Sequence, residues 1–168
     1  MRRGSDPCVK TLSSSGLTTS GSASFSGARQ TESLHRDHQI NDVALAPDGN
    51  TLFCAAGNVV QIWDLRRFSQ AGRLSGHQAP VMALALDTDG EHTLVISGSK
   101  DHYIKIFEVI DDAAGILTPK FNLDPPHYDG IQSLALRGHT LFSGSRDMCI
   151  KKWDLTTQQH KHSINAAH

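Results

Sequence analysis

The sequence predicts an all-β fold built from repeated, four-stranded antiparallel units. From His35 onward, short apolar runs recur between Gly, Pro, Asp and Asn residues, which is typical of strands joined by tight turns. An aromatic, an acidic and an aliphatic residue end three of these runs, at Leu65, Val109 and Leu155, which lie 44 and then 46 residues apart. A period of this length indicates structural repeats that stack on one another.

Each repeat is expected to contain four strands. The first strands are expected in "INDVALAPDG", "VMALALDTDG" and "IQSLALRG", the second in "TLFCAAG", "HTLVISGSKD" and "TLFSGSRD", the third in "VVQIWDL", "YIKIFEV" and "CIKKWDL", and the weaker fourth at about 72–74, 118–123 and 162–164. Four strands in a repeat of this length are the arrangement of one propeller blade. The sequence therefore predicts a partial β-propeller of three blades, at 35–74, 75–124 and 125–165.

The residues before the first blade differ from the blades in amino-acid composition. Residues 1–34 are rich in Ser, Gly and Thr and are expected to be a lead-in, with a possible stray strand at 8–12. Residues 166–168 resemble the start of a truncated further repeat. Propellers close with about four to eight blades, so we expect a piece of a longer chain whose outer blades expose apolar faces.

Composition excludes several classes of function. The net charge of −1 provides no broad basic field for nucleic acid or an anionic membrane surface. The cysteines, Cys8, Cys54 and Cys149, form no CxxC pair and suit a reducing compartment. The sequence contains no run of about eighteen apolar residues, which a membrane span would require. It also contains no GxxxxGK[ST] motif, which would indicate binding of a nucleotide phosphate. We therefore expect an intracellular protein that needs no cofactor.

The stretch "SGSRDMCIKKWDL" allows two interpretations of its polar residues. With His127 upstream, Ser143 and Asp147 could form a hydrolytic triad, which a serine-directed fluorophosphonate would label. However, Ser143 follows Leu141 and Phe142 on a strand, where its hydroxyl would be buried. The trio also recurs in the preceding repeat, as His77, Ser97 and Asp101. The pattern therefore favours a buried network that satisfies polar groups within the sheet, and no catalytic residue.

These residues resemble the WD40 repeats, whose blades carry a His, a Ser or Thr, an Asp and a Trp at such positions. The resemblance covers roughly residues 34–168. The tetrad positions are His127, Ser143, Asp147 and Trp153 in the third repeat, His77, Ser97, Asp101 and Phe107 in the second, and His38 and Trp63 in the first. Because Cys54 stands where the first repeat needs a hydroxyl and its turn is too short for the Asp, we expect that network to be broken.

Two further sets of residues could bind something. His160, His162 and His168 could suggest a metal site, but no Cys or carboxylate nearby completes a ligand set, so no metal is expected. The turns and loops at one end of the strands would share one surface in a propeller. The candidate partner rim there consists of Lys100, His102, Arg146, Met148, Gln78, Tyr128 and Asp129.

Longer stretches of the sequence resemble one particular group of WD40 proteins. "SGSKDHYIKIFEV", "PPHYDGIQSLAL" and "LFSGSRDMCIKKWDL" look like blades of the C-terminal propeller of kinesin-like proteins of the kinesin-4 group, of the kinesin family member twenty-one type. This resemblance implies a plus-end-directed microtubule motor as the parent, with its ATPase head, its stalk and the remaining blades elsewhere. We expect a non-enzymatic interaction module on the cytoskeleton that binds microtubules, tubulin or cargo adaptors. The alternative is a generic WD40 scaffold for a cytosolic signalling or adaptor complex.

Overall fold

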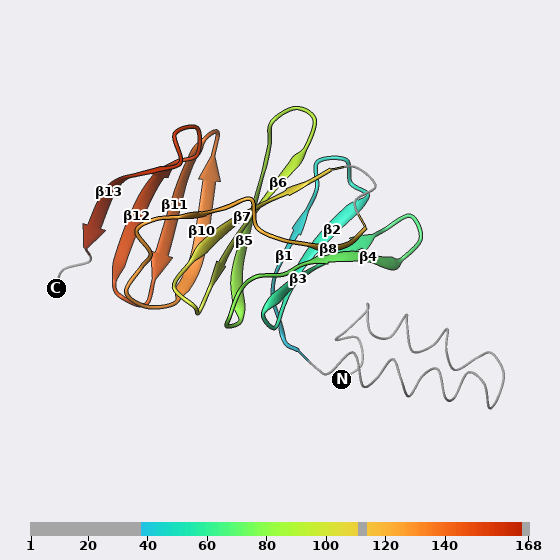
Figure 1. Ribbon diagram of the computed structural model, residues 1–168, viewed down its shortest axis with the longest axis horizontal. Coiled ribbons are helices and arrows are strands. Elements are labelled where there is room, and N and C mark those ends of the chain that lie inside the picture. Colours follow the sequence, from blue (N-terminus) through green and yellow to red (C-terminus); the bar gives the residue numbers. More distant parts are fainter. Residues whose placement is uncertain (1–37, 111–113, 166–168) are drawn as a thin grey trace. The chain divides into compact units, whose positions relative to one another are not determined.

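Three sheets, antiparallel except for one strand pair, follow one another along the chain (Figure 1). The computed structural model describes residues 38–110 and 114–165. The strands are β1 (Ile40–Leu45), β2 (Thr51–Ala56), β3 (Val59–Asp64), β4 (Ser69–Leu74), β5 (Val81–Thr88), β6 (Thr93–Ser99), β7 (Ile104–Val109), β8 (Gly115–Leu117), β9 (Phe121–Leu123), β10 (Ile131–Arg137), β11 (Thr140–Ser145), β12 (Cys149–Asp154) and β13 (Gln159–Asn165). The predicted all-β fold of four-stranded units is confirmed.

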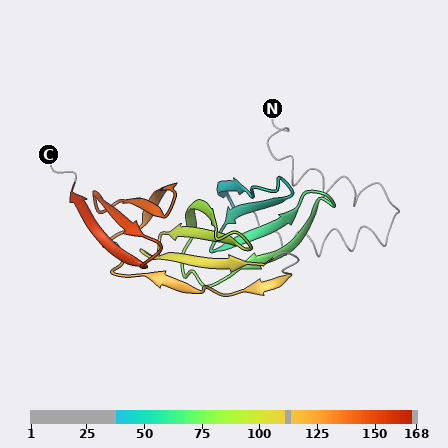
Figure 2. The ribbon, with the colours of Figure 1, turned by 90° about the horizontal axis from the view of Figure 1, so that it is seen from above.

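The order of strands is the same in each sheet. The first blade runs β1-β2-β3-β4, the second β5-β6-β7-β9 and the third β10-β11-β12-β13, and Figure 2 shows them succeeding one another in chain order. The first strand of every blade carries a register shift at the same place, after Ile40, Val81 and Ile131. An identical irregularity in three units indicates that one backbone pattern is repeated, in agreement with the sequence period.

The fourth strands differ from their predicted limits. Strands β4 and β13 are longer than expected, whereas β9 covers only the end of the expected 118–123. The preceding segment forms β8, which lies beside β4 of the first blade (Figure 1). The two strands pair in parallel, with Gly72 opposite Gly115. A Cβ on Gly72 would lie 2.6 Å from the Gly115 carbonyl oxygen, so this pairing depends on the absence of a side chain there.

Two apolar clusters lie between the blades. One joins the first and second blades and contains Phe53, Ile62 and Phe107; the other joins the second and third blades and contains Ile106 and Trp153. Neighbours on a strand thus face opposite clusters, because successive side chains alternate across a sheet. The second blade is covered on both faces, which explains why its strands are apolar on both sides.

Several expectations concern residues outside the described ranges. These are the lead-in at 1–34 with its possible strand at 8–12, and the start of a further repeat at 166–168. The described residues contain no helix with the length and apolarity that a membrane span requires.

Candidate functional site

A buried polar network joins four side chains of the third blade. His127 lies in the loop that enters β10, Ser143 on β11, Asp147 in the turn after β11, and Trp153 on β12. His127 Nε2 is 2.8 Å from Ser143 Oγ, and His127 Nδ1 is 2.9 Å from Asp147 Oδ2. The indole Nε1 of Trp153 donates to the same hydroxyl at 2.9 Å. One strand pair and one incoming loop are therefore tied together at a single buried point.

The donors and acceptors of this network match when the imidazole is neutral. The indole N–H can only donate, so the Ser143 hydroxyl accepts from Trp153 and donates its own proton to Nε2 of His127. The Nδ1–H of His127 then donates to the carboxylate of Asp147. Burial lowers the pKa of His127 below its ordinary value, although the neighbouring Asp147 opposes that shift. The imidazole therefore remains neutral near pH 7, as the network requires.

The carboxylate of Asp147 also fixes the backbone around it. Its Oδ2 accepts the N–H of Tyr128 at 2.9 Å, and its Oδ1 accepts the N–H of Cys149 at 2.8 Å. Burial tends to raise the pKa of Asp147, but these N–H groups and His127 outweigh burial and lower it below its ordinary value. One ionised side chain thus sets the position of both the entering loop and the turn.

The second blade has the same arrangement with one change. His77 Nε2 is 2.8 Å from Ser97 Oγ, and His77 Nδ1 is 2.8 Å from Asp101 Oδ2. Burial raises the pKa of Asp101, but hydrogen bonds from His77 and from the N–H of Gln78 outweigh it and lower the pKa to about 2. Phe107 has no N–H to offer, and Ser97 Oγ instead lies 3.4 Å from the Lys105 carbonyl oxygen.

The first blade does not build this network from its candidate residues. His38 is exposed, and Nε1 of Trp63 donates to Oε1 of Gln61 at 3.1 Å. Cys54 is buried and pairs in register with Gln61, as Ser97 pairs with Lys105 and Ser143 with Lys151. The Gln61 side chain therefore accepts the indole N–H, a role that the Ser143 hydroxyl has in the third blade.

Lys151 is a buried cation that sequence reasoning did not single out. Its Nζ donates to the carbonyl oxygens of Pro125 and Pro126, at 2.9 and 2.8 Å, and lies 5.7 Å from the centre of the Trp153 ring. Burial lowers the pKa of Lys151, while the charge of Asp147 opposes the shift. In the sequence, only its position two residues before Trp153 distinguishes Lys151 from other lysines. Its hydrogen-bond partners depend on the path of the loop before His127, which the sequence does not reveal.

The candidate partner rim lies where the turns after β6 and β11 meet the loops that enter β5 and β10. The His127 N–H donates to the His102 carbonyl oxygen at 3.2 Å, and a Cβ on Gly130 would lie 3.0 Å from the Cα of Lys100. The loop of the third blade therefore rests against the turn of the second. His102 and Met148 hold the same left-handed position in their turns, with φ of 79° and 65°.

Side chains at this rim point into solvent. Tyr128 is 88% exposed and Met148 is 64% exposed. The charged side chains of Lys100, Arg146 and Asp129 are also exposed, as are Gln78 and His102. The backbone beneath them is fixed, because the N–H groups of Gln78 and Tyr128 donate to the tetrad carboxylates. The candidate rim therefore combines exposed side chains with an anchored backbone.

Comparison with known proteins decides the family. The family "WD domain, G-beta repeat" matches residues 29–64, 68–108 and 119–154. The chain belongs to the WD40 repeat family. The solved structure of U3-55K superposes with a TM-score of 0.66 over 79% of this chain and 42% of that chain, at 22% identity. The predicted WD40 resemblance is confirmed.

Curated relatives of this WD40 chain are kinesin-like. It is 49% identical over 99% of its length to "Kinesin-like protein KIF21B" of Mus musculus, and 47% identical over 99% of its length to "Kinesin-like protein KIF21A" of Homo sapiens. It spans 10% of the length of each of these relatives. The resemblance to kinesin-like proteins that the sequence phrases indicated is therefore confirmed.

Burial and membership of the WD40 family both bear on the triad-like arrangement in the third blade. Ser143, His127 and Asp147 have the contacts of a hydrolytic triad, but Ser143 is 0% exposed and its oxygen already accepts the Trp153 indole. A substrate carbonyl could not approach that oxygen. WD40 domains are non-catalytic interaction folds, so this WD40 chain is an interaction module and not an enzyme.

His160 and His162, two of the three histidines near the C-terminus, lie on β13. The ring of His160 packs edge-on against Trp153 with 5.3 Å between ring centres, and its Nε2 lies 2.9 Å from Ser163 Oγ. His162 is exposed on β13, and His168 lies outside the described residues. The contacts with Trp153 and Ser163 thus account for the position of the His160 imidazole.

Proposed function

We propose that this WD40 module belongs to the tail of a kinesin-like motor and binds the microtubule lattice through its candidate partner rim. The observation that carries the proposal is the 49% identity to a kinesin-like protein over 99% of the chain. That resemblance extends through both rim turns and the loop that carries Tyr128. A cytoplasmic, cytoskeleton-associated location follows from the same proposal.

The chemistry of the rim supports an acidic partner. Lys100 and Arg146 occupy equivalent turns of neighbouring blades, and both are exposed. Two cations at fixed positions suit acidic surfaces of tubulin, and an exposed ion pair of this kind weakens with salt. Tyr128 and Met148 add exposed apolar area beside the cations, as interface anchors commonly do.

The buried networks contribute by holding the rim rigid. Asp101 and Asp147 accept N–H groups from both the turn and the loop on which the rim side chains stand. A surface that is already ordered loses less conformational entropy on binding. The polar network is thus connected to function through the rim, without contacting the partner.

Co-sedimentation with polymerised tubulin tests the proposal. The chain should pellet with microtubules, less so as salt rises, and Lys100→Glu with Arg146→Glu should reduce the bound fraction at least about tenfold. The matched control is Arg66→Glu with Arg67→Glu, which makes the same charge change in the exposed turn between β3 and β4, at the other ends of the strands. Samples without microtubules correct for self-association.

Either of two results would reject the lattice-binding mechanism. One is binding that responds neither to salt nor to the rim double variant. The other is absence of binding to microtubules together with capture of an adaptor from cytosol that lacks polymerised tubulin, which would support the generic scaffold instead.

A further inference from the structure

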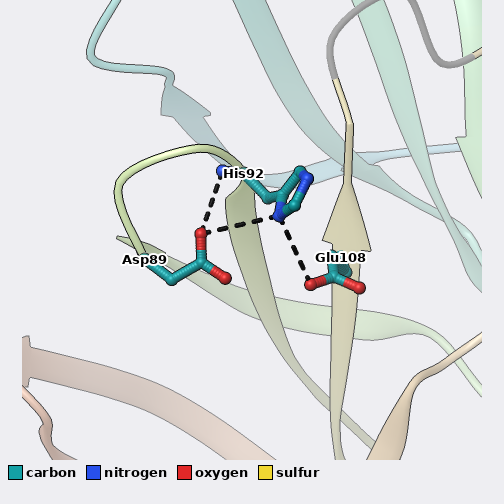
Figure 3. Close-up of side chains that lie close together, drawn as sticks. All are labelled: Asp89, His92 and Glu108. Atoms are coloured by element: carbon teal, nitrogen blue, oxygen red, sulfur yellow. Dashed lines mark hydrogen bonds and ion pairs between the residues drawn. The ribbon is translucent and has the colours of Figure 1, made fainter.

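A second cluster of polar side chains lies at the opposite ends of the strands from the rim. Asp89 and His92 belong to the turn between β5 and β6, and Glu108 lies on β7. Their side chains converge, as Figure 3 shows, and one ligand atom from each lies within 4.8 Å of the others. Neither the tetrads nor the candidate partner rim uses any of these residues.

The backbone holds the three side chains in place. Asp89 Oδ1 accepts the N–H groups of His92 and Glu91, at 2.9 and 3.3 Å, so the turn aims this carboxylate. The N–H of His92 is the main cause of a lowered pKa for Asp89, so the group stays ionised at neutral pH. Glu108 is fixed by the register of the sheet, opposite Leu94, two residues beyond His92.

The two separations that involve His92 are close to those between ligand atoms around a tetrahedral metal ion. Nδ1 of His92 is 3.6 Å from Asp89 Oδ1 and 3.6 Å from Glu108 Oε1 (Figure 3). Both distances are too long for hydrogen bonds. They are close to the separation of about 3.3 Å between neighbouring ligand atoms around Zn²⁺ with bonds of about 2.0–2.1 Å.

We propose that Asp89, His92 and Glu108 form a Zn²⁺ site, with the fourth position taken by water. One imidazole nitrogen and two carboxylate oxygens are a donor set that suits zinc better than calcium or magnesium, which prefer oxygen ligands alone. The partly exposed position of all three residues leaves the site open to an ion from solution.

Lys120 forms an ion pair with Glu108, one of the proposed zinc ligands. Lys120 Nζ lies 2.7 Å from Glu108 Oε1, the same oxygen that faces His92. Lys120 is half exposed, so it can turn into solvent when a divalent cation takes its place. As a cation it competes with zinc for this oxygen. Removing it should therefore tighten zinc binding, whereas removing a ligand should weaken it.

The experiment is a Zn²⁺ titration of the full chain against a chromogenic chelator at about pH 7.5, where unligated imidazole is mostly neutral. We expect His92→Gln and Asp89→Asn each to weaken the affinity of this site at least about tenfold, and Lys120→Met to tighten it several-fold. The control is His139→Gln, which removes the exposed imidazole 3.6 Å from Asp87 and should leave the affinity unchanged.

Thermal unfolding provides a second readout that is independent of the chelator. Zinc should raise the Tm of the wild-type chain and of Lys120→Met, but should raise that of His92→Gln much less. Unfolding without zinc checks that each variant folds. The site is disproved if the wild-type chain binds no zinc, if His92→Gln binds zinc as tightly as the wild type, or if Lys120→Met weakens binding.

Discussion

Ser143 and Ser97 are two buried hydroxyls that satisfy their hydrogen bonds differently. Ser143 accepts from an indole, whereas Phe107 offers Ser97 no N–H and the Ser97 hydroxyl lies 3.4 Å from the Lys105 carbonyl oxygen, to which it can only donate. A buried polar group left without a partner costs about 1–3 kcal/mol. Each member of a tetrad therefore depends on the others, and the loop that carries the imidazole is coupled to the strand that carries the hydroxyl.

The tetrads predict that the fold loses stability in acid in two stages. Burial lowers the pKa of His127, so below about pH 6.5 the unfolded chain binds a proton there that the folded chain does not. The pKa of Asp101 is lowered to about 2, so its contribution is complete above about pH 4 and is lost as the pH falls toward 2. That second contribution is about 2 kcal/mol. Urea unfolding at a series of pH values measures both stages.

A variant assigns part of the lower stage to Asp101. Asp101→Asn should reduce the loss of unfolding free energy between about pH 4 and pH 2 by about 2 kcal/mol, while the first stage and the part that comes from Asp147, whose pKa is also lowered, remain. Glu91→Gln, in an exposed turn, is the control and should leave both stages unchanged. An Asp101→Asn chain with the wild-type pH profile would contradict the assignment.

At the scale of elements, β8 links the second blade to the first by pairing with one of its strands. Strand β8 follows β7 of the second blade in the chain but pairs in parallel with β4 of the first blade. The next strand, β9, belongs to the second blade again. The N–H of Ser75 also donates to the Leu117 carbonyl oxygen at 2.9 Å. The outer edge of β4 is thereby paired, which protects it from association with other strands.

Gly72→Ala tests how far this pairing depends on close backbone approach. The added Cβ would lie 2.6 Å from the Gly115 carbonyl oxygen, so β8 should separate from β4 at a cost of about 1–2 kcal/mol. Hydrogen exchange at Ser75 and at residues 115–117 should become faster, while exchange in β9 stays slow. Arg73→Ala, at the exposed neighbouring position, should change neither; unchanged exchange in Gly72→Ala would show that β8 tolerates the methyl group.

Local sequence patterns predicted the main strands but not β8. Alternation and the repeat located three strands of every blade, because those strands pair with sequence neighbours through tight turns. Strand β8 has three residues and a parallel partner far away in the chain, so no local pattern marks it. The Asp89, His92 and Glu108 cluster was missed for a related reason: only the register of β6 with β7 brings Glu108 to the turn.

At the scale of the described unit, the two outer blades each have one face without a neighbouring blade. On the third blade this face exposes Phe142, Ile150 and Ile164. Lys152 lies there too, at the position equivalent to Ile62 and Ile106, which are buried against the next blade. On the first blade the corresponding outward face exposes Val43 and Leu45. Apolar sheet faces of this kind normally pack against the next repeat of a solenoid or propeller.

These faces predict that the 168-residue chain associates with itself when it is expressed alone. The outward face of the third blade in one copy is expected to pack on that of the first blade in another. Such head-to-tail contacts need not close into a ring. Sedimentation velocity should show a mass that grows with concentration, and Phe142→Asp with Ile150→Asp should reduce it strongly. The matched control, Tyr103→Asp with Ile110→Asp, replaces two exposed apolar residues that flank β7 of the second blade, outside both outward faces, and should leave association unchanged. A wild-type chain that sediments as a monomer at every concentration would contradict the prediction.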